Sequence, residues 1–260
     1  MQLKNIFILI LIFSSGLLCA QEKFQLSAPI AKYQSPFFKE STTLNYLFVQ
    51  PGAVVRYTID NREPDEHDKI FRQPIRIKKS CIIKAKAFGD SFLPSETVTV
   101  EFVKDGKKIV SAKVNTQHNK YPGSGPQTLF DDKGGNMDAS ASSWIGFDSD
   151  TVQISIRTAK KEKISEVLIS VLKNQGGWIF LPEKVEVSSS EDNSNLIATS
   201  SFDAVRQSPE NKIEYLHIKF PKPVETDLLS LTVYTVKSIP EWHSAKGKHA
   251  WFFIDEIKLY

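Results

Sequence analysis

The chain has 260 residues, with 33 basic and 30 acidic side chains and a formal net charge of +3 at pH 7. Because the lysines are dispersed along the chain, this balance gives no indication of nucleic-acid binding. The two cysteines are Cys19, in a segment expected to be removed, and Cys81, which excludes an intrachain disulfide in the mature protein. About 240 mature residues suit one large domain or two ordinary ones.

Residues 1–20 have the features of a secretory signal peptide. Lys4 precedes the apolar run Ile6–Phe13, and small residues follow it. This run is too short to span about 30 Å of hydrocarbon. We therefore expect a periplasmic, cell-surface or extracellular protein with no transmembrane segment in the mature chain. A lipid anchor on Cys19 is the less favoured alternative, because Leu18 stands where a lipoprotein signal usually has a small residue.

The rest of the chain has the two-residue periodicity of β-strands. Small or apolar residues alternate with lysines in Ile83–Ala87, and Val152–Arg157 and Lys184–Ser188 follow the same pattern. The longer apolar runs Ile164–Leu172 and Leu228–Val236 predict strands that are covered on both faces. Convincing helical patterning is absent, and turn signals recur between the runs. The sequence therefore predicts an all-β protein.

A polar, glycine-containing segment, Lys104–Lys108, separates two strand-like runs. We expect it to join two β-sandwiches, the first formed by residues 24–104 and the second by residues 109–260.

The stretch Arg56–Pro64 places two acidic residues close to arginines, between a strand-like run and a polar loop. Asp60 and Asn61 form a turn pair, because an aspartate side chain can accept backbone N–H bonds and asparagine tolerates the left-handed conformation. Pro64 then prevents the strand from continuing. We favour turn chemistry over a catalytic acid pair, which would require both carboxylates to face one substrate.

Four motifs follow one another in the segment Ser35–Val103: P-G-A-V-V-R-Y-T-I-D-N-R-E-P, P-I-R-I, I-I-K-A-K-A-F and F-L-P-S-E-T-V. In this order they resemble the chitobiase/β-hexosaminidase C-terminal domain. The resemblance implies a small fibronectin type III-like, immunoglobulin-like sandwich of the kind appended to secreted bacterial glycosidases, and no catalytic role. Asn61 stands where that family usually has glycine.

The second half carries four further motifs, at Leu129–Gly135, Ser143–Phe147, Gln175–Pro182 and His249–Ile257. They resemble the discoidin-type domains of the coagulation factor V/VIII type C group, which occur at the end of some secreted family 20 β-hexosaminidases. The resemblance covers Val110–Tyr260 and implies a galactose-binding-like jelly roll that holds ligands on loops at one end.

This second resemblance also implies a structural calcium ion. Its ligands would be Asp131, Glu256 and, less directly, Asp138, with backbone carbonyls of a glycine-rich loop completing a shell of oxygen atoms. Asp132 stands where the family usually has glycine, so the loop could be shaped differently. In the alternative interpretation Asp131 caps a turn and Glu256 is a solvated strand residue. Both interpretations stay open, and no organic cofactor is expected.

Tryptophans are candidates for sugar binding, because sugar rings present flat C–H faces that stack on aromatic surfaces. Trp178 and Trp242 lie in evident loops, whereas Trp144 and Trp251 adjoin strand-like runs where an aromatic residue is more often core. The expected ligand-binding residues are Asn174, Gln175, Trp178, Trp242 and His243.

Two further candidates for chemistry are weaker. The acidic segment Asp65–Asp68 could hold a metal but is more typical of a solvated loop. Cys81 opens a strand-like run, where a buried thiol is expected, and no nearby histidine would activate it. The sequence contains no G-x-S-x-G, no H-E-x-x-H, no phosphate-binding glycine loop and no paired cysteines with metal-ligand spacing.

The sequence thus predicts an exported, non-catalytic protein that binds a glycan containing N-acetylhexosamine or galactose through the loops of its second domain. The leading alternative is a structural or protein-interaction module that docks onto an exported partner such as a glycosidase. A glycoside hydrolase is the third hypothesis, and it would need two carboxylates converging at about 5 to 9.5 Å.

Overall fold

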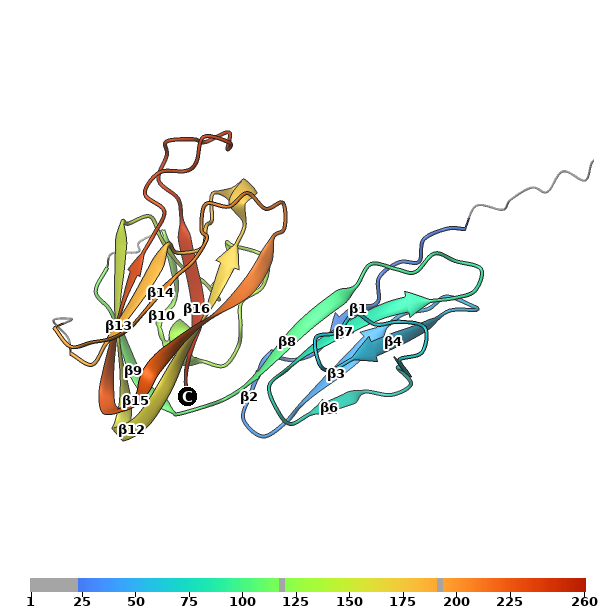
Figure 1. Ribbon diagram of the computed structural model, residues 1–260, viewed down its shortest axis with the longest axis horizontal. Coiled ribbons are helices and arrows are strands. Elements are labelled where there is room, and N and C mark those ends of the chain that lie inside the picture. Colours follow the sequence, from blue (N-terminus) through green and yellow to red (C-terminus); the bar gives the residue numbers. More distant parts are fainter. Residues whose placement is uncertain (1–22, 117–119, 191–193) are drawn as a thin grey trace, which may run out of the picture.

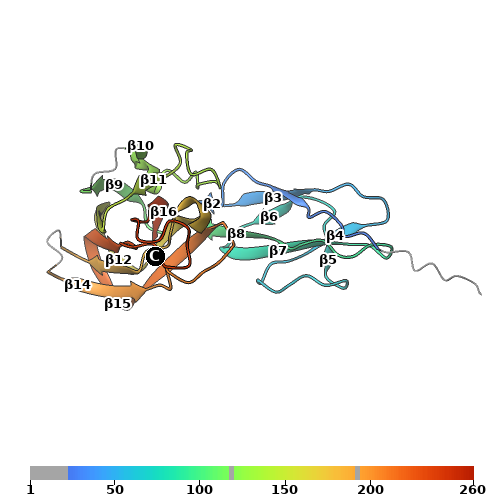
Figure 2. The same ribbon diagram turned by 90° about the horizontal axis from the view of Figure 1, so that it is seen from above.

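The computed structural model describes residues 23–116, 120–190 and 194–260, so the predicted signal peptide and Cys19 lie outside the described residues. The described chain is almost entirely β-structure, which confirms the predicted fold class. It forms two bodies that lie end to end (Figures 1 and 2). The helices described are two short 3-10 helices, η1 (Gln127–Phe130) and η2 (Gln175–Gly177), and neither is long and apolar enough to cross a membrane.

The first body is a sandwich of two sheets. One sheet has the order β1 (Ile30–Lys32), β3 (Thr42–Leu47), β6 (Ile75–Ile77), and the other has the order β2 (Phe37–Phe38), β8 (Val98–Lys104), β7 (Cys81–Phe88), β4 (Val54–Thr58), β5 (Lys69–Ile70). Leu44, Ile83 and Phe102 are fully buried between them. In β7 the alternation of buried alanine or isoleucine with half-buried lysine agrees with the predicted periodicity.

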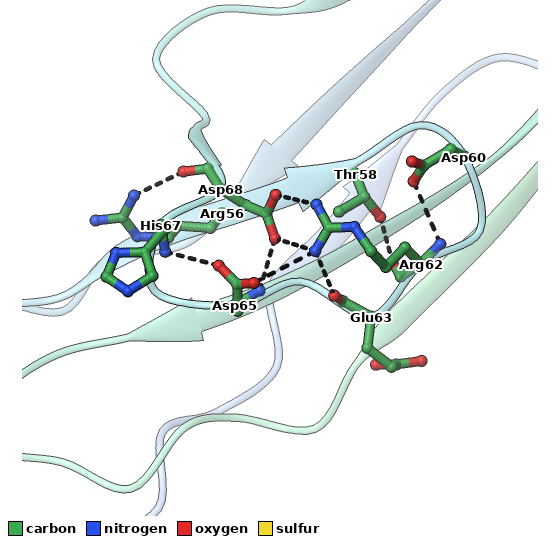
Figure 3. Close-up of polar contacts among 8 residues, drawn as sticks. All are labelled: Arg56, Thr58, Asp60, Arg62, Glu63, Asp65, His67 and Asp68. Atoms are coloured by element: carbon green, nitrogen blue, oxygen red, sulfur yellow. Dashed lines mark hydrogen bonds and ion pairs between the residues drawn. The ribbon is translucent and has the colours of Figure 1, made fainter.

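The predicted turn after β4 is confirmed. Asn61 has the left-handed φ of 66°, and the Asp60 carboxylate accepts a hydrogen bond of 3.3 Å from the backbone N–H of Arg62. Figure 3 shows this contact at the bend of the loop. Asp60 therefore shapes the chain, as turn chemistry requires.

The second body is built on one eight-stranded sheet. Its path is β10 (Tyr121–Pro126), β11 (Ile145–Phe147), β16 (Phe252–Leu259), β12 (Thr151–Lys173), β15 (Lys212–Tyr234), β13 (Lys184–Ser188), β14 (Leu196–Ser201), and β9 (Ile109–Val114) pairs with β12. The register of β12 against β15 shifts between Arg157 and Glu162. Because of this irregularity, the first half of β12 pairs with β9 and the second half with β16.

The long apolar run at the end of β12 is covered on both faces, as predicted. Val167, Ile169 and Val171 point into the main core. On the opposite face, Leu168 packs against the first body, and Leu172 packs beneath a loop cluster at the other end of the sheet.

The two bodies meet where β8 ends at Lys104 and β9 begins at Ile109. The backbone N–H of Lys107 donates to the oxygen of Leu259 at 2.7 Å, and the Tyr260 hydroxyl donates to the oxygen of Lys104 at 2.8 Å. The connecting segment is thereby hydrogen-bonded to the end of β16 (Figure 1).

Candidate functional site

An open hollow of about 320 Å³ lies where β12 ends and β16 begins. It is within the size range of small-molecule sites, roughly 300 to 1,000 Å³. Its polar and aromatic lining residues are Lys120, Tyr121, Asn174, Trp178, Trp251 and Phe253. We call it the Trp178 hollow.

The backbone of Trp178 is held from both sides. The residue caps η2 with a left-handed φ of 67°, which is strained for a bulky side chain. Its N–H donates to the oxygen of Gln175 at 2.9 Å, and its own oxygen accepts from the N–H of Trp251 at 2.8 Å. Asn174 supports the turn by accepting from the N–H of Gly177 at 2.9 Å. The indole remains 39% exposed at the rim of the hollow.

Three aromatic rings form the floor of the hollow. The ring centroids of Tyr121 lie 5.1 Å from Trp251 and 4.9 Å from Phe253. The Lys120 ammonium lies 5.1 Å above the Tyr121 ring and 5.2 Å above the Trp251 ring. Trp251, expected in the core, packs against a buried cluster but is only partly buried, and it also lines the hollow. Trp144, in contrast, is fully buried as expected.

Trp242 lies beside a different hollow, of about 540 Å³, on the other side of η2. Its ring is 38% exposed, and its indole N–H donates to the oxygen of Val205 at 3.1 Å. The two exposed tryptophans thus line separate depressions, with Gly176 on the border of both.

Gln175 and His243, both expected to contact a ligand, use their side chains to join loops. The Gln175 amide donates to the oxygen of Arg206 and accepts from the N–H of Ser208, both at 2.9 Å. His243 Nδ1 accepts from the N–H of Ala245 at 3.0 Å, so Nε2 carries the proton and donates to the oxygen of Gln175 at 2.9 Å. Their polar atoms are therefore engaged within the protein.

The structure does not bring the expected calcium ligands together. Asp131 accepts from the N–H of Lys133 at 3.1 Å, and Asp138 accepts from Ser140, so both cap turns. The turn at Asp131 agrees with the alternative interpretation, but Glu256 is not solvated: this side chain is completely buried, and it accepts from the N–H of Asp132 at 2.9 Å. Among the described residues no group of three His, Cys, Asp or Glu side chains could hold a metal ion.

A lysine stands beside Glu256 instead. The Lys258 ammonium lies 3.2 Å from the Glu256 carboxylate and 2.8 Å from Asp105, and it also forms an ion pair with Asp132. Burial alone would lower the pKa of Lys258, but the carboxylates outweigh burial and raise this pKa above its usual range. Burial raises the pKa of Glu256 to about 8; the Lys258 ammonium opposes this shift, and the neighbouring Asp255 and Asp132 add to it.

The acidic segment of the first body is neutralised by an arginine (Figure 3). The Arg62 guanidinium forms a two-pronged contact with Asp68 and lies 3.4 Å from Asp65. The hydrogen bond from Arg62 lowers the pKa of Asp68. His67 contacts these residues through its backbone N–H, which donates to the Asp65 carboxylate at 2.8 Å. The segment has the contacts of a loop rather than of a metal site.

Cys81 lies at the start of β7 and is partly buried. Burial raises the pKa of its thiol, which disfavours the thiolate that a nucleophile needs.

Comparison with known proteins gives one family match. The family model described as Fn3 associated matches residues 47–102, which lie within the segment that resembles the chitobiase/β-hexosaminidase C-terminal domain. No curated protein matches the chain.

Three solved structures illustrate the structural similarities. The CBM32 of AlyQ in complex with 4,5-unsaturated mannuronic acid is 13% identical, with 59% of this chain and 96% of that chain covered and a TM-score of 0.39. The family 32 CBM of Clostridium perfringens NanJ in complex with galactose is 15% identical, with 57% and 91% covered and a TM-score of 0.36. The GH31 CBM32-2 bound to GalNAc is 16% identical, with 59% and 99% covered and a TM-score of 0.36.

Proposed function

We propose that the protein is an exported, non-catalytic glycan-binding protein that holds a sugar in the Trp178 hollow. The observation that carries this proposal is the exposed Trp178 ring, whose backbone is held in a strained conformation above an aromatic floor. Because the backbone of Trp178 is already held in place, this loop loses little conformational freedom when a ligand stacks on the ring.

Polar groups around the rings complete a sugar site. Asn174 uses its Oδ1 atom for Gly177, whereas its NH₂ group donates no hydrogen bond among the described residues and is available to a sugar hydroxyl. Apolar surface with a few polar groups at the edge is typical of small-ligand sites. Among its described lining residues the hollow has no carboxylate, so the acid pair of a glycoside hydrolase is missing there.

We predict that Trp178→Ala abolishes binding on a glycan array probed with protein lacking residues 1–20, because the stacking surface is removed. We expect the bound glycans to contain N-acetylhexosamine or galactose. Trp242→Ala is the matched control: this tryptophan is equally exposed but lines the other hollow, so binding should persist. Equal binding by wild type and Trp178→Ala would refute this site.

Docking onto an exported protein is the second candidate function, and exposed apolar side chains around a depression of the first body support it. A hollow of about 310 Å³ lies in the first body and is lined by Phe24, Leu26, Ile30, Leu47, Val49 and Phe92. Phe24 is 78% exposed and Val49 is 95% exposed, which is typical of interaction surfaces when such residues cluster. A folded protein that binds nothing on a broad glycan array would favour this function.

A further inference from the structure

The cation of the Trp178 hollow has no acidic partner in the part of the chain that the structure describes. Lys120 lies over the faces of Tyr121 and Trp251, and its contacts there are with the rings alone. By contrast, Lys39, Lys133 and Lys258 all pair with carboxylates of the segment after η1 or of β16.

We propose that Lys120 makes this hollow selective for sugars that carry a carboxylate, such as uronic acids. The inference rests on the proposed function, because it assumes that a glycan occupies the hollow. A pyranose stacked on the Trp178 ring covers the aromatic floor and removes water from around the ammonium. A carboxylate on that sugar then compensates the ammonium with a charge-assisted hydrogen bond, which a hydroxyl does less well.

The test compares a galacturonic acid oligosaccharide with the galactose oligosaccharide of the same linkage by calorimetry. We expect the acidic oligosaccharide to bind about tenfold more tightly, consistent with a hydrogen bond to a charged group. Lys120→Gln should remove this preference, so that the acidic and the neutral oligosaccharide bind this variant with equal affinity. Lys160→Gln is the control, because this exposed lysine lies on β12 and does not line the hollow.

Each outcome of this test decides something different. Equal affinities in wild type, or a preference that survives in Lys120→Gln, would overturn the role of Lys120 while leaving glycan binding intact. A sulfated galactose oligosaccharide that binds better than the uronic acid would also overturn the carboxylate assignment. If the wild-type protein bound neither of these two oligosaccharides and no glycan on the array, the proposed function would be overturned as well. The acid preference should shrink as salt is added.

A second and independent observation concerns Lys258. Its ammonium group carries three N–H bonds, and three carboxylates surround it, those of Asp105, Asp132 and Glu256. These residues belong to the connecting segment, to the loop after η1 and to β16. Asp132 takes the left-handed φ of 62°, at the position where the discoidin-type pattern has glycine.

We infer that the Lys258 ammonium replaces the calcium ion that the family resemblance implies, so the protein carries its cation as a side chain. The replacement explains why an aspartate is tolerated at position 132, since its carboxylate has a fixed cation to bind. It also explains why Asp131 and Asp138 face turns and not Glu256. Through Asp105 the same cation reaches the segment that leads to the first body.

Thermal unfolding with and without excess EDTA or millimolar calcium tests this inference. We expect the melting temperature of wild type to stay the same in all three conditions. Lys258→Met should lower it by about 6 to 20 °C, because it leaves buried carboxylates without their cation. Lys258→Arg keeps the charge and should recover part of this loss.

A wild-type protein that is destabilised by EDTA or stabilised by calcium would overturn the inference. It would equally be overturned if Lys258→Met were as stable as wild type. The EDTA and calcium measurements on wild type remain decisive even if Lys258→Met does not fold.

Discussion

Replacing Trp144 by alanine is expected to lower the free energy of unfolding by about 3 to 5 kcal/mol, the usual cost of removing a buried large aromatic side chain. Trp144 is fully buried, and its indole N–H donates to the oxygen of Asn136 at 2.9 Å. Gly135 packs directly on the ring, since a Cβ there would lie 2.1 Å from it. The cavity would therefore be lined by backbone that cannot easily collapse into it.

The same substitution should also weaken glycan binding. Trp144 packs in one cluster with Leu172, Ile179 and Phe253, and the last two residues line the Trp178 hollow. Urea unfolding followed by circular dichroism measures the stability, and the glycan array measures the binding. The Trp178→Ala variant separates the loss of binding from the loss of stability. It should lose glycan binding, but its free energy of unfolding should change by only about 0.5 kcal/mol, because the side chain is exposed. A Trp144→Ala protein as stable as Trp178→Ala would contradict this expectation.

Substituting Gly106 by alanine is expected to open the joint between the two bodies. An added Cβ would lie 1.9 Å from the backbone oxygen of Leu259 and 2.8 Å from the Tyr260 ring. Because Leu259 lies in the buried strand β16, the connecting segment has to move instead. The movement would break the hydrogen bond from Lys107 to Leu259 and separate Asp105 from Lys258, at a cost of about 1 to 3 kcal/mol.

Small-angle X-ray scattering measures the opening as an increase in the radius of gyration and in the flexibility of the particle. Gly176→Ala is a suitable control, because the nearest atom to its added Cβ is 3.8 Å away and no clash results. Unchanged scattering for Gly106→Ala would show that the joint tolerates the methyl group.

The strand architecture was accessible from the sequence because its signals are local. The alternation in Ile83–Ala87 predicts a strand with one buried face, and the apolar run Ile164–Leu172 predicts a strand covered on both faces. The burial of β7 and of the end of β12 agrees with these predictions. The left-handed turn at Asn61 follows from the chemistry of the two residues that form it.

The candidate site was less accessible because it depends on contacts between distant segments. Trp251 follows the pattern of a core residue, and only the packing of η2 beside β16 leaves its ring at the hollow. Lys258 lies in the strand-like C-terminal run, and nothing near it in sequence reveals that Asp105 lies within reach. Gln175 and His243 look equally available in isolation, but loops more than thirty residues away engage them.

Strand β16 begins beside the Trp178 hollow and ends at the joint with the first body (Figure 1). Eight residues in extended conformation span roughly 26 Å. The hollow and the first body therefore lie at opposite ends of the same strand, and the depression around Phe24 lies in the first body. If the hollow binds a glycan and the first body binds an enzyme, as proposed, the protein would act as a tether. It would raise the local concentration of the enzyme near an extended polysaccharide and leave the bonds next to the bound sugar accessible.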